Sequence, residues 1–139
     1  MAGAPIEAIL MLCDSAQSVA GKLYILGGGW TQLNNRTPPA MGLAIKLEIS
    51  EDLAGERLPL LARLVTLSGE PVISGGNRVE FAADLEFARR PGSPLETPVG
   101  SVLALNAQFG GTLTFEPGGY AWELLSGEEI LARSVFRVV

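Results

Sequence analysis

Hydrophobic side chains recur at every second position over most of this chain, and this period constrains the fold more than any other feature. The segment GLAIKLEIS, from Gly42 to Ser50, has leucine or isoleucine at alternate positions, with Lys46 and Glu48 between them. RVEFAADLEF, LALNAQF and YAWELL repeat the pattern. Successive side chains of a strand point to opposite faces, so each segment is expected to bury one face and expose the other.

Glycine and proline separate these segments at short intervals, as in GGGW, NNRTPPA, SGGN and EPGG. Helical periodicity is scarce. About seven to nine short strands with such turns predict an all-β fold, an antiparallel two-sheet β-sandwich of immunoglobulin-like type. The length of 139 residues fits a single domain, residues 1–139. The longest loop, residues 89–100, is expected to cross between the two sheets.

Three segments depart from simple alternation. Ile6–Cys13 and Leu23–Leu26 are apolar on both faces, which predicts strands buried on both sides or paired near the domain centre. In Leu58–Leu67 the even positions should point inward with Arg63 outward. Val65 and Leu67 break that phase, so a bulge or an apolar patch is expected near the end of this strand.

The closing segment LTFEPGGYAW resembles the tyrosine corner of immunoglobulin-like sandwiches. In that arrangement a tyrosine at the start of the penultimate strand packs inward and its hydroxyl bonds a backbone group upstream. Tyr120 and Trp122 are therefore predicted to be structural. The last strand, ILARSVFRVV, is expected at a sheet edge, where pairing with a second copy would form a homodimer.

Composition excludes several classes of protein. Hydrophobic residues make up 47% of the chain and charged residues 18%, which is incompatible with a disordered protein. This composition indicates either a thick core or an extra apolar face reserved for a partner. The ten basic residues are spread along the chain instead of clustered, so nucleic-acid binding is not expected. The N-terminal segment lacks the features of a secretory signal, and no apolar run is long enough to span a membrane. A cytoplasmic location is predicted.

The reactive residues are few. The chain has no histidine, which removes Ser-His-Asp and Cys-His pairs and the usual zinc and iron sites. The single cysteine, Cys13, lies in an apolar run and is expected to be a small buried hydrophobe. The glycines of GGGW precede no helix start, so they do not predict a phosphate loop. We predict no catalytic residue, no metal site and no cofactor.

Trp30 and the polar residues after it are the candidate contact residues. An aromatic side chain beside Asn34, Asn35 and Arg36 could anchor a protein partner or stack on a sugar ring. Alternatively, Trp30 folds back and covers one end of the sandwich.

Motifs spread over most of the chain carry a family resemblance. Cys13, Asp14 and Ala16 close an apolar strand, a GKLxxLG strand follows from Gly21 to Gly27, and a GxYxxxL strand runs from Gly118 to Leu124. These motifs resemble a family of small bacterial proteins, common in actinobacteria, that is known as a domain of unknown function. The resemblance implies an all-β sandwich and no established activity. From its own position after a strand, Asp14 is predicted to cap backbone N–H groups in a turn.

The features together predict a non-catalytic protein-binding or assembly module. A small-ligand or carbohydrate-binding sandwich that uses Trp30 is the alternative. A carboxylate-dependent hydrolase is the second alternative, because 15 acidic residues are present.

Overall fold

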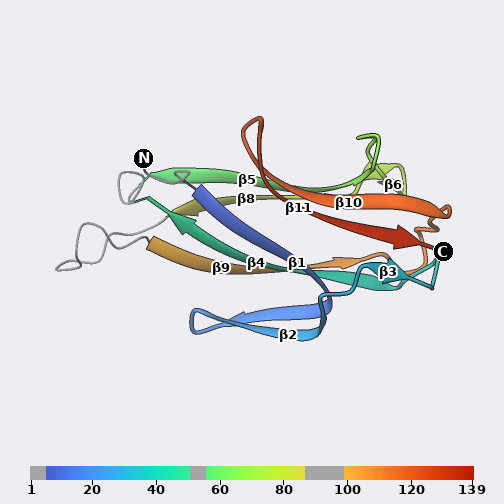
Figure 1. Ribbon diagram of the computed structural model, residues 1–139, viewed down its shortest axis with the longest axis horizontal. Helices are drawn as coiled ribbons and strands as arrows, with labels where there is room; N and C mark the ends of the chain where they lie inside the picture. The colour runs from blue at the N-terminus through green and yellow to red at the C-terminus, as the bar shows by residue number, and fades with distance from the viewer. Residues whose placement is uncertain (1–5, 51–55, 87–98) are drawn as a thin grey trace.

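The structure is a computed structural model and describes residues 6–50, 56–86 and 99–139. All of its described elements are strands, arranged in two facing sheets (Figure 1). Sheet A has the order β2-β1-β4-β9, sheet B has the order β3-β11-β10-β5-β8, and β6 and β7 form a separate short pair. The strands are β1 (Ile6–Val19), β2 (Lys22–Gly28), β3 (Gln32–Leu33), β4 (Ala40–Ile49), β5 (Arg57–Thr66), β6 (Ile73–Ser74), β7 (Asn77–Arg78), β8 (Glu80–Glu86), β9 (Val99–Gln108), β10 (Gly118–Ser126) and β11 (Glu129–Val138).

The core lies between the two sheets and follows the predicted alternation. Leu43, Ile45 and Leu47 of β4 are buried on the inner face of sheet A, and Trp122 of β10 is 0% exposed in sheet B. In β8 the residues alternate between half-buried and exposed from Glu80 to Glu86. The predicted all-β sandwich is confirmed. The described residues form eight long strands and three strands of two residues, against the seven to nine strands expected.

The tyrosine corner is present. The Tyr120 hydroxyl donates a hydrogen bond of 2.7 Å to the Glu116 carbonyl, four residues upstream. The Tyr120 ring stacks on Phe136 at 5.7 Å and meets Phe115 edge-on at 4.9 Å. Burial raises the pKa of the Tyr120 phenol, which keeps it a neutral donor. The structural roles predicted for Tyr120 and Trp122 agree with these positions.

The C-terminal strand does not lie at a sheet edge as expected. β11 lies between β10 and the two-residue β3, which pairs with Arg137 and Val138 in parallel. Farther back along β11, the Ser134 hydroxyl donates to the Leu10 carbonyl of sheet A. The loop that follows Trp30 thus runs beside the terminal strand, and the edges of the two main sheets are β2, β9, β3 and β8.

The end of β5 carries the predicted apolar patch and no bulge. Its pairing with β10 is regular from Leu61 to Thr66. Val65 points to the outer face of sheet B, where a bridge to Pro71 helps to cover it, while Leu67 is exposed. The broken phase in the sequence therefore reflects a local covering of the outer face.

Burial on both sides, one of the two alternatives predicted for Ile6–Cys13 and Leu23–Leu26, was wrong. Ile6–Cys13 pairs with β4 in an interior strand of sheet A, whereas Leu23–Leu26 lies in its edge strand β2. After Cys13 the chain bends away from β4, and the second half of β1 pairs with β2 (Figure 1). The resulting hairpin lies against the outer face of sheet A as a partial third layer. No described residue covers the other side of the hairpin, so apolar residues on both of its faces remain in water.

The loop at residues 89–100 falls mostly outside the described residues. The strands before and after it, β8 and β9, belong to different sheets. That residues 1–139 form one domain stays a prediction. In the part of the chain that the structure describes, no helix has the length and apolar character needed to cross a membrane.

Candidate functional site

The β1–β2 hairpin is held to the sandwich by one amide side chain. The Ala16 N–H donates to Asn106 Oδ1 at 3.1 Å, and Asn106 Nδ2 donates to the Ala16 carbonyl at 2.9 Å. Asn106 lies on β9, so its amide binds the hairpin backbone much as a neighbouring strand would. These bonds fix the hairpin over sheet A at the point where β1 has left β4.

Small residues beneath the hairpin allow this close approach. Cys13, Ala16 and Ala44 are buried together, with Leu23 and Ala104 packed against them. A Cβ added to Gly42 would lie 2.8 Å from Cys13 Sγ and 2.9 Å from Ser15 Cα. Burial, and next the charge of Asp14, raise the pKa of the Cys13 thiol. Cys13 is thus the small buried hydrophobe predicted from sequence.

The hairpin and the start of β1 expose a concentration of large apolar side chains. Among the described residues, six of the eleven exposed large hydrophobics belong to β1 and β2. Leu26 is 68% exposed, Ile9 60% and Tyr24 56%. We call this group the apolar hairpin surface; its members are Ile9, Met11, Val19, Tyr24, Ile25 and Leu26.

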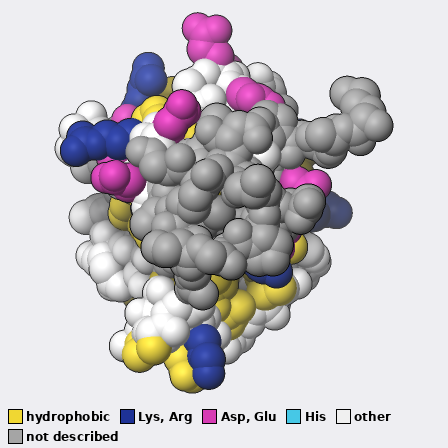
Figure 2. Space-filling view, turned by 90° about the vertical axis from the view of Figure 1, so that its left-hand side faces the viewer, with side chains coloured by type: hydrophobic (Ala, Val, Ile, Leu, Met, Phe, Trp, Pro, Cys, Tyr) yellow, Lys and Arg dark blue, Asp and Glu magenta, His cyan; other side chains and the backbone are white. Residues whose placement is uncertain are grey.

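The charges lie mainly on the other side of the molecule. Figure 2 shows hydrophobic side chains at the lower end, where the hairpin lies, and most acidic and basic side chains toward the upper end, over sheet B. Across the outer face of sheet B, Glu123 lies between Arg63 and Arg133, and Glu80 is the register partner of Arg63. The two faces of the sandwich therefore offer different chemistry to a partner.

Glu123 is the one buried charged side chain among the described residues, at 7% exposure. Arg63 donates to its Oε1 at 3.0 Å, and Arg133 Nε lies 3.6 Å from its Oε2. Two arginines thus compensate the carboxylate. This arrangement is an ion-pair cluster on the outer face of sheet B.

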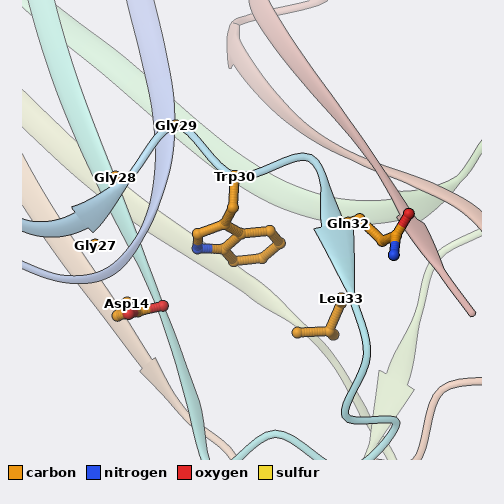
Figure 3. A pocket seen from close by; sticks show the side chains of 7 residues that line it. All are labelled: Asp14, Gly27, Gly28, Gly29, Trp30, Gln32 and Leu33. Atoms are coloured by element: carbon orange, nitrogen blue, oxygen red, sulfur yellow. The ribbon is translucent and has the colours of Figure 1, made fainter.

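Trp30 packs inward, as the lid alternative expected. Its ring meets Phe136 edge-on, with centroids 5.6 Å apart. It borders a shallow hollow of about 490 Å³ whose other lining residues include Asp14 and Gln32. Figure 3 shows the indole nitrogen on the side of the ring toward Gly27 and Asp14. This nitrogen is buried and has no hydrogen-bond partner among the described residues.

The polar residues predicted to act with Trp30 do not line this hollow. Arg36 Nε donates to the Val139 carbonyl at 3.2 Å, and Asn35 Oδ1 accepts from the Thr37 N–H at 3.0 Å. Asn34 Oδ1 accepts from the Gln32 side chain. Arg36 thus ties the loop to the C-terminal residue, while Asn34 and Asn35 bond within the loop, so the candidate set from the sequence does not form one site.

Asp14 does not lie at a turn. Strand β1 continues past it to Val19, and an added Cβ on Gly27 of β2 would overlap its carboxylate. Within residues 6–50, 56–86 and 99–139, no group of three or more cysteine and acidic side chains is placed to hold a metal ion.

The sequence matches the model of a family of unknown function, DUF6941, over residues 8–139. The chain belongs to this family. The predicted membership in a family without an assigned function is thereby confirmed, whereas the actinobacterial source and the motif pattern stay predictions. A comparison with curated proteins found no match.

Three solved structures align with most of this chain. The alkylpurine DNA glycosylase AlkC of Pseudomonas fluorescens, bound to DNA with an abasic site analog, aligns over 98% of this chain with a TM-score of 0.53 and 15% identity. The chain spans 31% of that glycosylase. An immunoglobulin-like protein of Pseudomonas aeruginosa aligns over 99% of this chain and 94% of its own, with a TM-score of 0.45 and 19% identity. A β-glucosidase of Listeria innocua aligns over 96% of this chain and 16% of its own, with a TM-score of 0.44 and 12% identity.

Sequence reasoning missed Asn106, Glu123 and Gly42. Each carries a weak signal, because a polar or very small residue interrupts an otherwise apolar strand. Asn106 follows LAL in β9, and Glu123 stands between Trp122 and Leu124 in β10. The signal marks these positions as unusual but does not identify their partners, which come from distant strands.

Proposed function

We propose that this protein is a non-catalytic protein-binding module that docks another protein on the apolar hairpin surface. The carrying observation is the concentration of exposed apolar side chains on β1 and β2. Apolar surface left in water is unfavourable by roughly 25 cal/mol per Å², and a concentration of exposed apolar side chains commonly marks an interaction site. The partner is a protein with an apolar, weakly charged surface.

The hairpin is built to present this surface. Asn106 and the buried cluster of Cys13, Ala16 and Ala44 hold its base, so little conformational entropy is lost on docking. Strands β1 and β2 carry only Glu7, Asp14 and Lys22 as charged residues. Removing this surface from water therefore desolvates few charges. A bacterial, cytoplasmic setting is part of the proposal and rests on the family resemblance and the sequence features.

The alternatives receive less support. Trp30 is packed against Phe136, and its polar neighbours in the loop bond the chain itself, which argues against a sugar-stacking site. The compensated Glu123 argues against a hydrolase that uses two carboxylates.

The test compares partner capture by two charge-introducing variants. Tyr24→Lys/Leu26→Lys alters the apolar hairpin surface, and the matched control Ile130→Lys/Val135→Lys alters exposed apolar residues of sheet B. Affinity capture from the source organism is followed by cross-linking through Lys22 at the hairpin tip. We expect wild type and control to capture the same protein with cross-links to Lys22, and the hairpin variant to lose it. Equal capture by all three proteins, or no capture by wild type, contradicts the proposal.

A further inference from the structure

Strand β9 has one paired edge and one open edge. It pairs with β4 along its whole length, from Val99 to Gln108, without a register shift. Sheet A ends at β9, and no described residue forms a ladder with its other side. Ten residues of regular strand therefore present an unpaired row of backbone groups.

The hydrogen-bond pattern identifies which groups face outward. Phe109 N–H donates to the Pro39 carbonyl at 2.8 Å, which continues the β4–β9 register and marks this pair as hydrogen-bonded. Bonded pairs alternate in an antiparallel ladder, so the odd-numbered residues of β9 bond β4. The N–H and C=O groups of the even-numbered residues point away from β4; these residues are Gly100, Val102, Ala104, Asn106 and Gln108.

The composition of β9 leaves this edge unprotected. The strand VGSVLALNAQ contains no charged residue and no proline. The edge strand β8 of sheet B, in contrast, carries Glu80, Asp84 and Glu86 at its exposed positions. Charges at an edge prevent pairing with other chains, and β9 lacks this protection.

We propose that the open edge of β9 binds β9 of a second copy of this chain, in antiparallel orientation around a two-fold axis. The pair joins two copies of sheet A into one continuous eight-stranded sheet. The inference goes beyond the proposed function, because it uses the backbone edge of β9 and not the side chains of β1 and β2. The two surfaces meet at Asn106, which borders one hollow with Tyr24 and Leu26.

A second copy fits because β9 is compatible with itself. A two-fold register centred on Ala104 places Val102 opposite Asn106 and Gly100 opposite Gln108 of the partner, and it pairs all five outward-facing residues. No like charges meet in this register. The same operation on β8, centred on Ala83, would place Glu80 opposite Glu86 and repel. The nearest charges on the outer face of β4, Lys46 and Glu48, already pair with each other at 3.4 Å.

The first test removes one outward N–H. Val102→Pro deletes a donor that faces the second copy and leaves the ladder with β4 intact, while Val102→Thr keeps the donor and the β-branched shape. Because of the two-fold axis, Val102→Pro removes two hydrogen bonds from the dimer interface, one from each copy. By sedimentation velocity we expect wild type and Val102→Thr to be dimers and Val102→Pro to dimerise about tenfold more weakly or not at all. A wild-type monomer, or equal dimerisation of all three, overturns the proposal.

The second test reads the register and does not depend on the proline variant folding. Gly100→Cys and Gln108→Cys are made separately in a Cys13→Ala background; a Cβ at Gly100 meets only the Leu47 carbonyl, at 3.6 Å. Paired Cα atoms about 5.5 Å apart are within disulfide range. We expect mild oxidation of the mixture to yield the mixed disulfide well above either homodisulfide. A dimer that gives no mixed disulfide overturns the β9 register.

The two proposals fail separately. Tyr24→Lys/Leu26→Lys should leave the dimer intact, and Val102→Pro should leave capture through the hairpin intact. Val102→Pro could lose both dimerisation and capture through the hairpin while unfolding at the same urea concentration as Val102→Thr. That result would contradict the separation of the two surfaces.

Discussion

Asn106 and Ala16 are 90 residues apart in the sequence, and the Asn106 side chain bonds both backbone groups of Ala16. The backbone of the first half of β1 pairs with β4. The backbone of the second half pairs with β2 and has no neighbouring strand on its other side among the described residues. Asn106 supplies the missing partner where β1 bends. The orientation of the apolar hairpin surface therefore depends on this side chain of sheet A together with the buried cluster of Cys13, Ala16 and Ala44.

Replacing Asn106 with alanine should loosen the hairpin. Asn106→Ala leaves the Ala16 N–H and C=O without their protein partners, at a cost of about 1–2 kcal/mol in the free energy of unfolding. Urea unfolding measures the loss, and amide hydrogen exchange should accelerate at Ala16. Gln108→Ala, on the same face of β9, is the control and should change neither. Unchanged exchange at Ala16 would show that the side chain does not hold the hairpin.

Adding a methyl group to Gly42 should push the hairpin away from sheet A. The new Cβ would come within 2.9 Å of Ser15 Cα, a backbone atom that cannot rotate away. We expect Gly42→Ala to lower the free energy of unfolding by about 1–3 kcal/mol. Gly100→Ala, also in sheet A, meets nothing closer than 3.6 Å and should be neutral or slightly stabilising. Similar stability of the two variants would contradict the close packing at Gly42.

Neutralising Glu123 should weaken the outer face of sheet B. Glu123→Gln keeps the shape of the side chain but removes the charge shared by Arg63 and Arg133. Both arginines are partly exposed, so the expected loss is about 1–2 kcal/mol and should shrink in high salt. Glu48→Gln, which affects the exposed pair with Lys46, should cost less than about 0.5 kcal/mol. A loss that does not depend on salt would argue against an ionic contribution.

Stability should fall at alkaline pH, and Cys13 should be the first cause. The pKa of its thiol is raised by burial above the ordinary value of 9.0, so the folded state favours the neutral thiol. This contribution is complete below pH 9.0 and is lost as the pH rises through the folded-state pKa. Tyr120 acts in the same direction from its ordinary value of 10.0 upward. Urea unfolding measured between pH 9.0 and pH 10.0 should show a smaller decline in the free energy of unfolding for Cys13→Ala than for wild type. Identical slopes of this free energy against pH would contradict the assignment to Cys13.

The strands and the core could largely be predicted from the pattern of residues close together in the sequence. Alternation placed Leu43, Ile45 and Trp122 in the core because a strand side chain can face only one of two sides, and the neighbouring polar residues decide which. The Tyr120 corner was recognisable because its hydroxyl bonds Glu116, only four residues away. Interactions over so short a span leave a trace in consecutive residues.

The candidate site was less accessible to the sequence. Trp30, Asn34, Asn35 and Arg36 are neighbours in the chain, but the structure turns Trp30 toward Phe136 and ties Arg36 to Val139. For Leu23–Leu26 the sequence indicated a strand with two apolar faces and therefore burial. Burial requires a layer on each side, and among the described residues sheet A alone supplies one.

Strand period, turn spacing and the absence of histidine were determined by the sequence alone, because each depends on residue type or on neighbours a few positions apart. Which apolar residues remain in water, which edge stays open at β9, and which amide binds Ala16 were decided by the tertiary structure. These outcomes depend on the order and bending of strands, and that order is set by contacts between segments far apart in the chain.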